Sequence, residues 1–344
     1  MSDSFLRAWR RPAPFHPDED ALSLVVRMAT YGDMSIDEFK SRYLDAAHDW
    51  LIYLPFKMEV LRRLGVIANV ALVPLADNAC AGTVDVPASR SGSPKHFRGR
   101  TLPDGWISLD KRVAPGMLRS DGDDPYIRLA WRFSAFPCDP ITGETLLNRC
   151  PSCSANLNWD TKKIESCHQC RFDLRNAPPS FADTQVLQDV RAIAGAIGLI
   201  DGVKAGPIDL PAPLGDLDLE QQLSVLQWCA RLRGAVERTG TSGGPATAHM
   251  GLKIARAWPA PLLEVADLLL RQYDAGQREQ YPILVEMLDG VSPHTLRDLM
   301  IEQASEAMSA AWFAVRDRYA STWRGKPRPE YMDLTAFRIR DRTN

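Results

Sequence analysis

The spacing of apolar positions predicts helices in the first third of the chain. Apolar residues recur at helical spacing over residues 22–29, and Gly32 is a suitable residue to end that helix. Ser35 with Glu38 three residues later fits the capping box that opens a second helix. A third apolar stretch covers residues 56–73.

The pattern then dissolves before the middle of the chain. Residues 77–126 are rich in Gly, Pro, Ser and Asp and show no sustained period, which indicates short strands or a partly mobile segment. Apolar and polar residues alternate over residues 126–136, which predicts a strand.

Helical spacing returns in the second half of the sequence. Residues 184–200 are amphipathic, and Asp218 is placed to cap a further apolar run. Another helix is expected over residues 261–273. Ser292, followed by a proline, is an N-cap with Pro at the first helical position and predicts a long final helix. We find no internal repeat in the sequence.

Composition places the chain among ordinary globular proteins. A length of 344 residues predicts two or three domains, and the net charge of −2 means that any nucleic-acid contact must come from local basic patches. The N-terminal residues carry no apolar signal-peptide core, and the most apolar window, residues 64–76, is too short to span a membrane. We therefore expect a cytoplasmic protein that makes no membrane contact and whose thiols stay reduced.

Two CxxC pairs separated by 13 residues are the strongest chemical signal. Their cysteines are Cys150, Cys153, Cys167 and Cys170. Four thiolates complete the tetrahedral shell of Zn²⁺ and leave no position for a reactive water, so we expect one structural zinc. Rubredoxin-like iron and a redox dithiol remain alternatives for the same residues. His168, inside the second pair, is expected to face solvent and not to bind the metal.

No other motif indicates catalysis. Cys80, Cys138 and Cys229 have no partner at CxxC spacing and are expected to be buried apolar residues. The acidic cluster at residues 121–124 (DGDD) fits a solvated turn better than a metal site. The sequence contains no phosphate-binding loop and no nucleophile elbow, so we expect a protein that is not an enzyme.

Two basic segments are candidates for contact with nucleic acid. Their residues are Arg90, Lys95, Arg98 and Arg100 in the irregular segment, and Arg338, Arg340 and Arg342 near the C-terminus. Basic residues near an aromatic suit phosphate contact combined with base stacking. A solvated loop and an ordinary charged tail explain the pattern equally well, and both interpretations stay open.

Two segments together resemble the TniQ family, the target-site selection proteins of transposons. DEDALSLVVRMATYGDMSIDEF resembles the opening of that family through Glu19, Leu22, Ser23, Arg27, Ala29 and Gly32. LAWRFSAFPCDPITGETLLNRCPSCSANLNWDTKKIESCHQCRFDL is similar to its zinc-finger region, and KIARAWPAPLLEVADLLL to its tryptophan-proline helix. The family's first zinc site uses an upstream CxxC and a C-x-x-H pair. This chain keeps Cys138 but has Ile141 in place of the histidine, so that site is predicted to be lost.

The resemblance implies a non-catalytic adaptor in transposition. Such an adaptor bridges target DNA, or a DNA-bound guide-RNA complex, and an AAA+ ATPase, and a homodimer is compatible with this role. The alternatives are a zinc-ribbon transcriptional regulator and a protein-binding scaffold. The expected fold is mainly α with a small zinc ribbon, in three domains: residues 1–135 (irregular over 77–126), 136–177 and 178–344.

Overall fold

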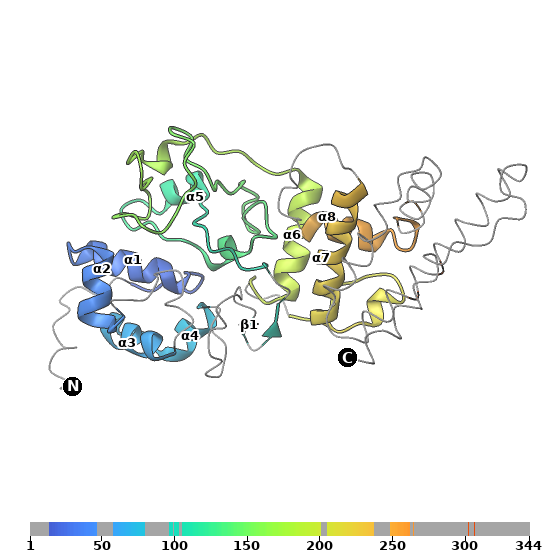
Figure 1. The fold of residues 1–344 in the computed structure, drawn as a ribbon, viewed down its shortest axis with the longest axis horizontal. Helices are drawn as coiled ribbons and strands as arrows, with labels where there is room; N and C mark the ends of the chain where they lie inside the picture. The colour runs from blue at the N-terminus through green and yellow to red at the C-terminus, as the bar shows by residue number, and fades with distance from the viewer. Residues whose placement is uncertain are drawn as a thin grey trace, which may run out of the picture. The chain divides into compact units, whose positions relative to one another are not determined.

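The structure is a computed structural model. It describes residues 14–46, 58–79, 96–98, 100–102, 105–200, 205–236 and 248–261, and the single residues 264, 302 and 306. Within these residues the fold is mainly helical with little strand, as predicted (Figure 1). The chain divides into two compact units, residues 1–205 and 206–344, which are described separately. The expected division into three domains stays a prediction.

The first unit begins with four short helices and a π-helical turn, drawn in blue in Figure 1. They are α1 (Ala21–Tyr31), α2 (Ile36–Phe39), η2 (Lys40–Leu44), α3 (Met58–Ala68) and α4 (Leu72–Asp77). Helix α1 begins at the N-cap Asp20, and α2 begins at Ser35, whose hydroxyl accepts a hydrogen bond from the Glu38 amide at 3.1 Å, as predicted. The described part of the apolar stretch, from Met58, forms two helices, because the backbone turns at Asn69, which has a φ of 55°.

Helix α1 ends before Gly32, but the residue with left-handed backbone is Asp33 and not the glycine. Gly32 has a φ of −82° and stays in the right-handed region, whereas the next residue, Asp33, has a φ of 49°. Aspartate tolerates the left-handed region better than most side chains, so the turn does not require the glycine at that point.

The rest of the first unit consists of short elements. They are β1 (His96–Phe97) and β2 (Arg100–Thr101), which pair antiparallel, α5 (Pro115–Ser120), the 3₁₀ helices η4 (Leu129–Arg132) and η5 (Leu174–Asn176), and α6 (Thr184–Ala196). The strand predicted over residues 126–136 is wrong, since its centre forms η4. Residues 129–133 are all buried, so their burial does not follow the alternation that a strand requires.

One hydrophobic core joins the N-terminal helices to the cysteine region. Leu22 of α1, Trp131, Trp159 and the two cysteines Cys150 and Cys167 belong to this core, and each is at most 2% exposed. The cysteine region is therefore packed against the helices of its own unit. Among the helices that the structure describes, none combines the length and the apolar composition that a membrane crossing requires.

The second unit contains a helix pair. Its elements are the 3₁₀ helix η6 (Leu214–Asp216), α7 (Leu219–Val236) and α8 (Ala248–Arg256). As predicted, Asp218 caps α7, accepting a hydrogen bond from the Gln221 amide at 2.9 Å. A Cβ on Gly251 of α8 would lie only 2.0 Å from the carbonyl oxygen of Leu226, so the two backbones approach closely and require glycine there. Of the helices predicted from residues 261 and 292, the structure describes only residues 261, 264, 302 and 306, all helical, and the other residues of both lie outside the described part of the chain.

Candidate metal centre

Each CxxC pair lies in the same kind of backbone turn. In the first knuckle (Cys150–Ala155), the Ser154 amide donates to the Cys150 carbonyl, and the Cys150 amide donates to the Ala155 carbonyl, both at 2.8 Å. Backbone pairing of Arg149 with Asn156 closes the turn. These bonds hold the two cysteines of the pair on one side of the turn.

The second knuckle (Cys167–Phe172) repeats this pattern. The Arg171 amide donates to the Cys167 carbonyl and the Cys167 amide to the Phe172 carbonyl, both at 3.0 Å, and Ser166 pairs with Asp173. The eight residues CPSCSANL and CHQCRFDL are therefore structurally equivalent, ending on Leu157 and Leu174, which are both fully buried. This short repeat was missed in the sequence because only the cysteines and the leucine are identical.

The two knuckles bring four sulfurs together. The Sγ atoms of the predicted ligands, Cys150, Cys153, Cys167 and Cys170, all lie within 4.8 Å of one another. The sulfurs of Cys150 and Cys170 are 3.6 Å apart, and those of Cys153 and Cys167 are 3.8 Å apart. This cluster can hold a metal ion, and its soft donor set is compatible with a structural zinc. It is the one group of this kind within the described residues.

Backbone amides act on the thiols of the cluster. The Phe172 amide lowers the pKa of Cys170 to about 7. At the equivalent position the Ala155 amide lowers the pKa of Cys153, but burial and hydrogen bonds with the other three thiols raise it to about 12. Burial raises the pKa of Cys150. Without metal the cluster therefore keeps protons that a bound cation would displace.

The second knuckle also holds His168, whose position differs from the prediction. Its side chain is half-buried, and its Nδ1 atom is buried without a hydrogen-bond partner. The expectation that it faces solvent is therefore wrong in part.

A buried lysine lies behind the second knuckle. The Nζ atom of Lys111 donates to the carbonyl oxygens of Ile164 at 3.2 Å and Ser166 at 3.0 Å, and the side chain is fully buried. Burial lowers the pKa of Lys111 to about 8, although the charges of Cys167 and Glu165 oppose this shift. Lys111 was not predicted from the sequence, because nothing next to it in the chain indicates burial.

The loop at Cys138 is held by polar side chains. Asp139 accepts hydrogen bonds from the Trp131 indole at 2.8 Å and from the Ile141 amide at 2.9 Å. Arg191 of α6 donates to the Ile141 carbonyl at 2.6 Å. Cys138 is buried, as is Cys229 in the second unit, and both agree with the expectation for isolated cysteines. Cys80 lies outside the described residues.

The acidic cluster 121–124 forms a turn with Gly122 and Asp123 exposed, as predicted, but Asp121 and Asp124 are half-buried and form ion pairs. Asp121 forms a two-point ion pair with Arg128, with both oxygen–nitrogen distances at 2.6 Å. Asp124 accepts hydrogen bonds from the Arg27 guanidinium and from the Tyr31 hydroxyl. The arginine that binds Asp124 is 97 residues away in the sequence, which is why the pattern around the aspartates did not reveal the pairing.

Three residues that carry the TniQ resemblance form one buried network. The Glu19 carboxylate accepts hydrogen bonds from the Ser23 hydroxyl at 2.9 Å and from Arg27 at 2.6 Å. Burial raises the pKa of Glu19 to about 7 against the opposing effects of Arg27 and Ser23. These polar residues therefore join α1 to the segment that precedes it and, through Arg27, to Asp124.

Most of the predicted nucleic-acid residues lie outside the described part of the chain. They are Arg90, Lys95, Arg338, Arg340 and Arg342. Arg98 is exposed, but its guanidinium donates to the Gly198 carbonyl and to Asn78 and lies over the Phe97 ring. Arg100 is half-buried in β2. Arg98 thus has an internal structural role, whatever else it contacts.

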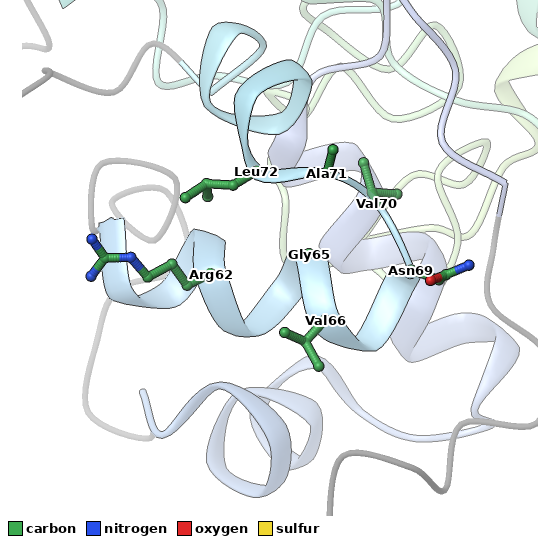
Figure 2. A pocket seen from close by; sticks show the side chains of 7 residues that line it. All are labelled: Arg62, Gly65, Val66, Asn69, Val70, Ala71 and Leu72. Atoms are coloured by element: carbon green, nitrogen blue, oxygen red, sulfur yellow. The ribbon is translucent and has the colours of Figure 1, made fainter. Parts of the chain in front are cut away.

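A hollow lies beside α3 and α4. The residues that line it come from the C-terminal half of α3, the following turn and the start of α4, as Figure 2 shows: Arg62, Gly65, Val66, Asn69, Val70, Ala71 and Leu72. Arg62 also lies 3.6 Å from the Glu59 carboxylate. The lining contains no carboxylate, thiol or histidine, so this hollow offers no group for acid–base or metal chemistry.

Comparison of the sequence with models of known protein families gives no match. Comparison with curated proteins also gives none. The resemblance to the TniQ family therefore stays a prediction.

Proposed function

We propose that this protein is a zinc-stabilised, non-catalytic adaptor that binds DNA and recruits an AAA+ ATPase of a transposition system. The zinc lies on the four clustered cysteines, within a ribbon module over residues 136–177, between helical domains over 1–135 and 178–344. The protein acts in the cytoplasm on target DNA, directly or through a DNA-bound guide-RNA complex. The transposition role rests on the resemblance to the TniQ family.

The proposed zinc has a structural role. Four thiolates fill its tetrahedral shell, so the metal offers no open position at which a water or a substrate could bind. Its two ligand pairs come from knuckles 17 residues apart, and the core of the first unit packs against both. The metal thus holds a surface rigid for binding and supplies no reaction of its own.

Exposed cations around the cysteines carry the DNA-binding part of the proposal. They are Arg149, Lys162, Lys163 and Arg171. Within the described residues no hydrogen bond or ion pair occupies these side chains, whereas Arg27, Arg112, Arg119 and Arg128 are all engaged in internal contacts. Exposed cations on a rigid module suit contact with phosphates, which position a protein on DNA without reading its sequence.

The test is a reconstitution of this protein with an AAA+ ATPase of a transposition system and with target DNA. The Cys167→Ser variant loses a zinc ligand and should abolish the three-part complex while leaving the basal ATP hydrolysis of the ATPase unchanged. An adaptor that holds two partners at once gains affinity from both, so weak binary contacts are sufficient. Cys229→Ala, which removes a buried thiol outside the cluster, is the matched control and should assemble normally.

The other outcomes separate the alternatives. ATP hydrolysis or DNA cleavage by this chain alone would contradict a non-catalytic adaptor. Binding to DNA without binding to the ATPase would favour a zinc-ribbon transcriptional regulator. Binding to proteins without any contact to DNA would favour a scaffold.

A further inference from the structure

Lys111 is a buried cation with an unusual set of neighbours. Both of its hydrogen-bond acceptors are backbone carbonyls, those of Ile164 and Ser166, and no carboxylate of the described residues forms an ion pair with it. A buried charge is unfavourable unless an opposite charge lies near it. The residue that follows Ser166 is the ligand Cys167, so the metal centre is the nearby candidate for that charge.

The charge of the proposed metal centre is opposite to that of the Lys111 ammonium group. A divalent metal with four thiolates carries a net charge of −2. The ammonium group of Lys111 lies 3.0 Å from the carbonyl oxygen of Ser166, the residue next to the predicted ligand Cys167. Charges interact more strongly in a protein interior than in water, because little solvent screens them. The buried cation and the doubly negative centre therefore stabilise each other.

We propose that Lys111 is a positioning residue of the metal centre that stabilises its doubly negative, divalent form. Its ammonium group lowers the energy of the tetrathiolate complex and, through the carbonyls of Ile164 and Ser166, holds the turn that leads into the second knuckle. Ferric iron with four thiolates carries a charge of only −1, so the same cation favours Zn²⁺ and Fe²⁺ over Fe³⁺. This inference rests on the proposed metal centre and is independent of the adaptor role.

The first experiment measures zinc affinity by competition with a chromophoric chelator on the full-length protein. Lys111→Gln retains N–H donors for the two carbonyls but loses the charge, and Lys111→Met loses both. Both variants should bind zinc roughly tenfold more weakly, the effect typical of groups that support metal ligands. Lys162→Met removes an exposed cation of the same region and should leave zinc affinity unchanged.

The second experiment separates charge from a purely structural role. Loaded with iron, the Lys111→Gln variant should have a lower Fe³⁺/Fe²⁺ reduction potential than the wild type, because the cation that favours the more negative ferrous form is gone. Glu165→Gln removes a negative charge from the same region and should raise the potential. A lysine that only filled space would alter metal retention without shifting the potential.

Several results would overturn the proposal. An unchanged potential in Lys111→Gln, or an equal shift in Lys162→Met, would show that the charge of Lys111 does not act on the metal. If Lys111→Gln fails to fold, Lys111→Met decides, and an unchanged potential in that variant counts against the proposal. A wild-type protein that binds no metal would instead overturn the metal centre itself.

Discussion

Ser154 and Arg171 occupy equivalent positions in the two knuckles, and both have a φ of 60°. Each directly follows the second cysteine of its CxxC pair, where the chain turns back along itself. Side chains other than glycine rarely adopt this left-handed conformation, which costs roughly 1–2 kcal/mol. In both knuckles, therefore, the residue after a predicted metal ligand is one that disfavours its own backbone conformation.

Replacing either residue with glycine should stabilise the protein. The gain is expected to reach about 1 kcal/mol for Ser154→Gly, because relief of the left-handed strain exceeds the extra entropy that glycine gives the unfolded chain. Chemical denaturation of the metal-loaded protein measures this difference. Ser154→Ala removes the hydroxyl but keeps the strain, so it should give no gain. Equal stability of the glycine and alanine variants would contradict the argument.

Purified protein should contain about one zinc per chain, as a single four-thiolate site requires. Elemental analysis of protein purified under reducing conditions measures this ratio, and Cys153→Ser should reduce it strongly. Cys138→Ser is the matched control, since Cys138 lies outside the cluster. A ratio near two would reveal a second site, and a metal-free wild type would refute the assignment.

Removal of the metal should loosen the knuckle region before the helices. Chelation is expected to increase amide hydrogen exchange over residues ~145–175, because much of the folding free energy of a small metal module comes from binding the metal. Helix α7 belongs to the other compact unit and serves as the internal reference. Identical exchange with and without chelator would mean that hydrogen bonds alone hold the knuckles.

Local signals in the sequence were sufficient to predict much of the helical structure and the four clustered cysteines. Caps such as Ser35 and Asp218 were predicted because a capping residue and its target amide are only three positions apart. The cysteine cluster was predicted because ligand type and spacing together restrict the chemistry. Helix α8 was missed because it follows a Gly-rich segment and is short.

Features that depend on distant parts of the chain were not predictable from local patterns. Apolar and polar residues alternate in the sequence around η4, which predicted a strand. The polar residue of η4 is nevertheless buried, because other segments of the chain pack against it. Arg27 and Asp124 are 97 residues apart, and Lys111 lies 53 residues before Ile164, the first of its two acceptors. A single sequence gives no direct indication of such pairs, since their energies arise only when the chain has folded.

The buried Glu19 should make stability depend on pH. Its pKa is raised from 4.5 to about 7, so the folded protein retains a proton that the unfolded chain releases. Protonated Glu19 therefore stabilises the folded state fully below about pH 4.5. As the pH rises through about 7 this stabilisation is lost, and the free energy of unfolding falls by up to about 3 kcal/mol. Glu19→Gln should reduce this dependence in denaturation measured from pH 5 to 8, with the exposed Glu38→Gln as control. A stability that rises with pH over this range in the wild type but not in Glu19→Gln would show that Glu19 is ionised in the fold.

DNA binding should be modest and sensitive to salt, because a chain of net charge −2 can neutralise only a few phosphates. Replacing Lys162 and Lys163 with Ala should lower the slope of log K against log salt by up to about two, roughly 0.9 for each phosphate contact that is lost. The same argument predicts a decrease of up to about three when Arg338, Arg340 and Arg342 are replaced together. Fluorescence anisotropy with one duplex at several salt concentrations measures both slopes. Unchanged slopes in both variants would exclude these residues as phosphate contacts. Arg100→Ala would then test the strand pair β1–β2, because the guanidinium of Arg98 is already engaged in internal hydrogen bonds.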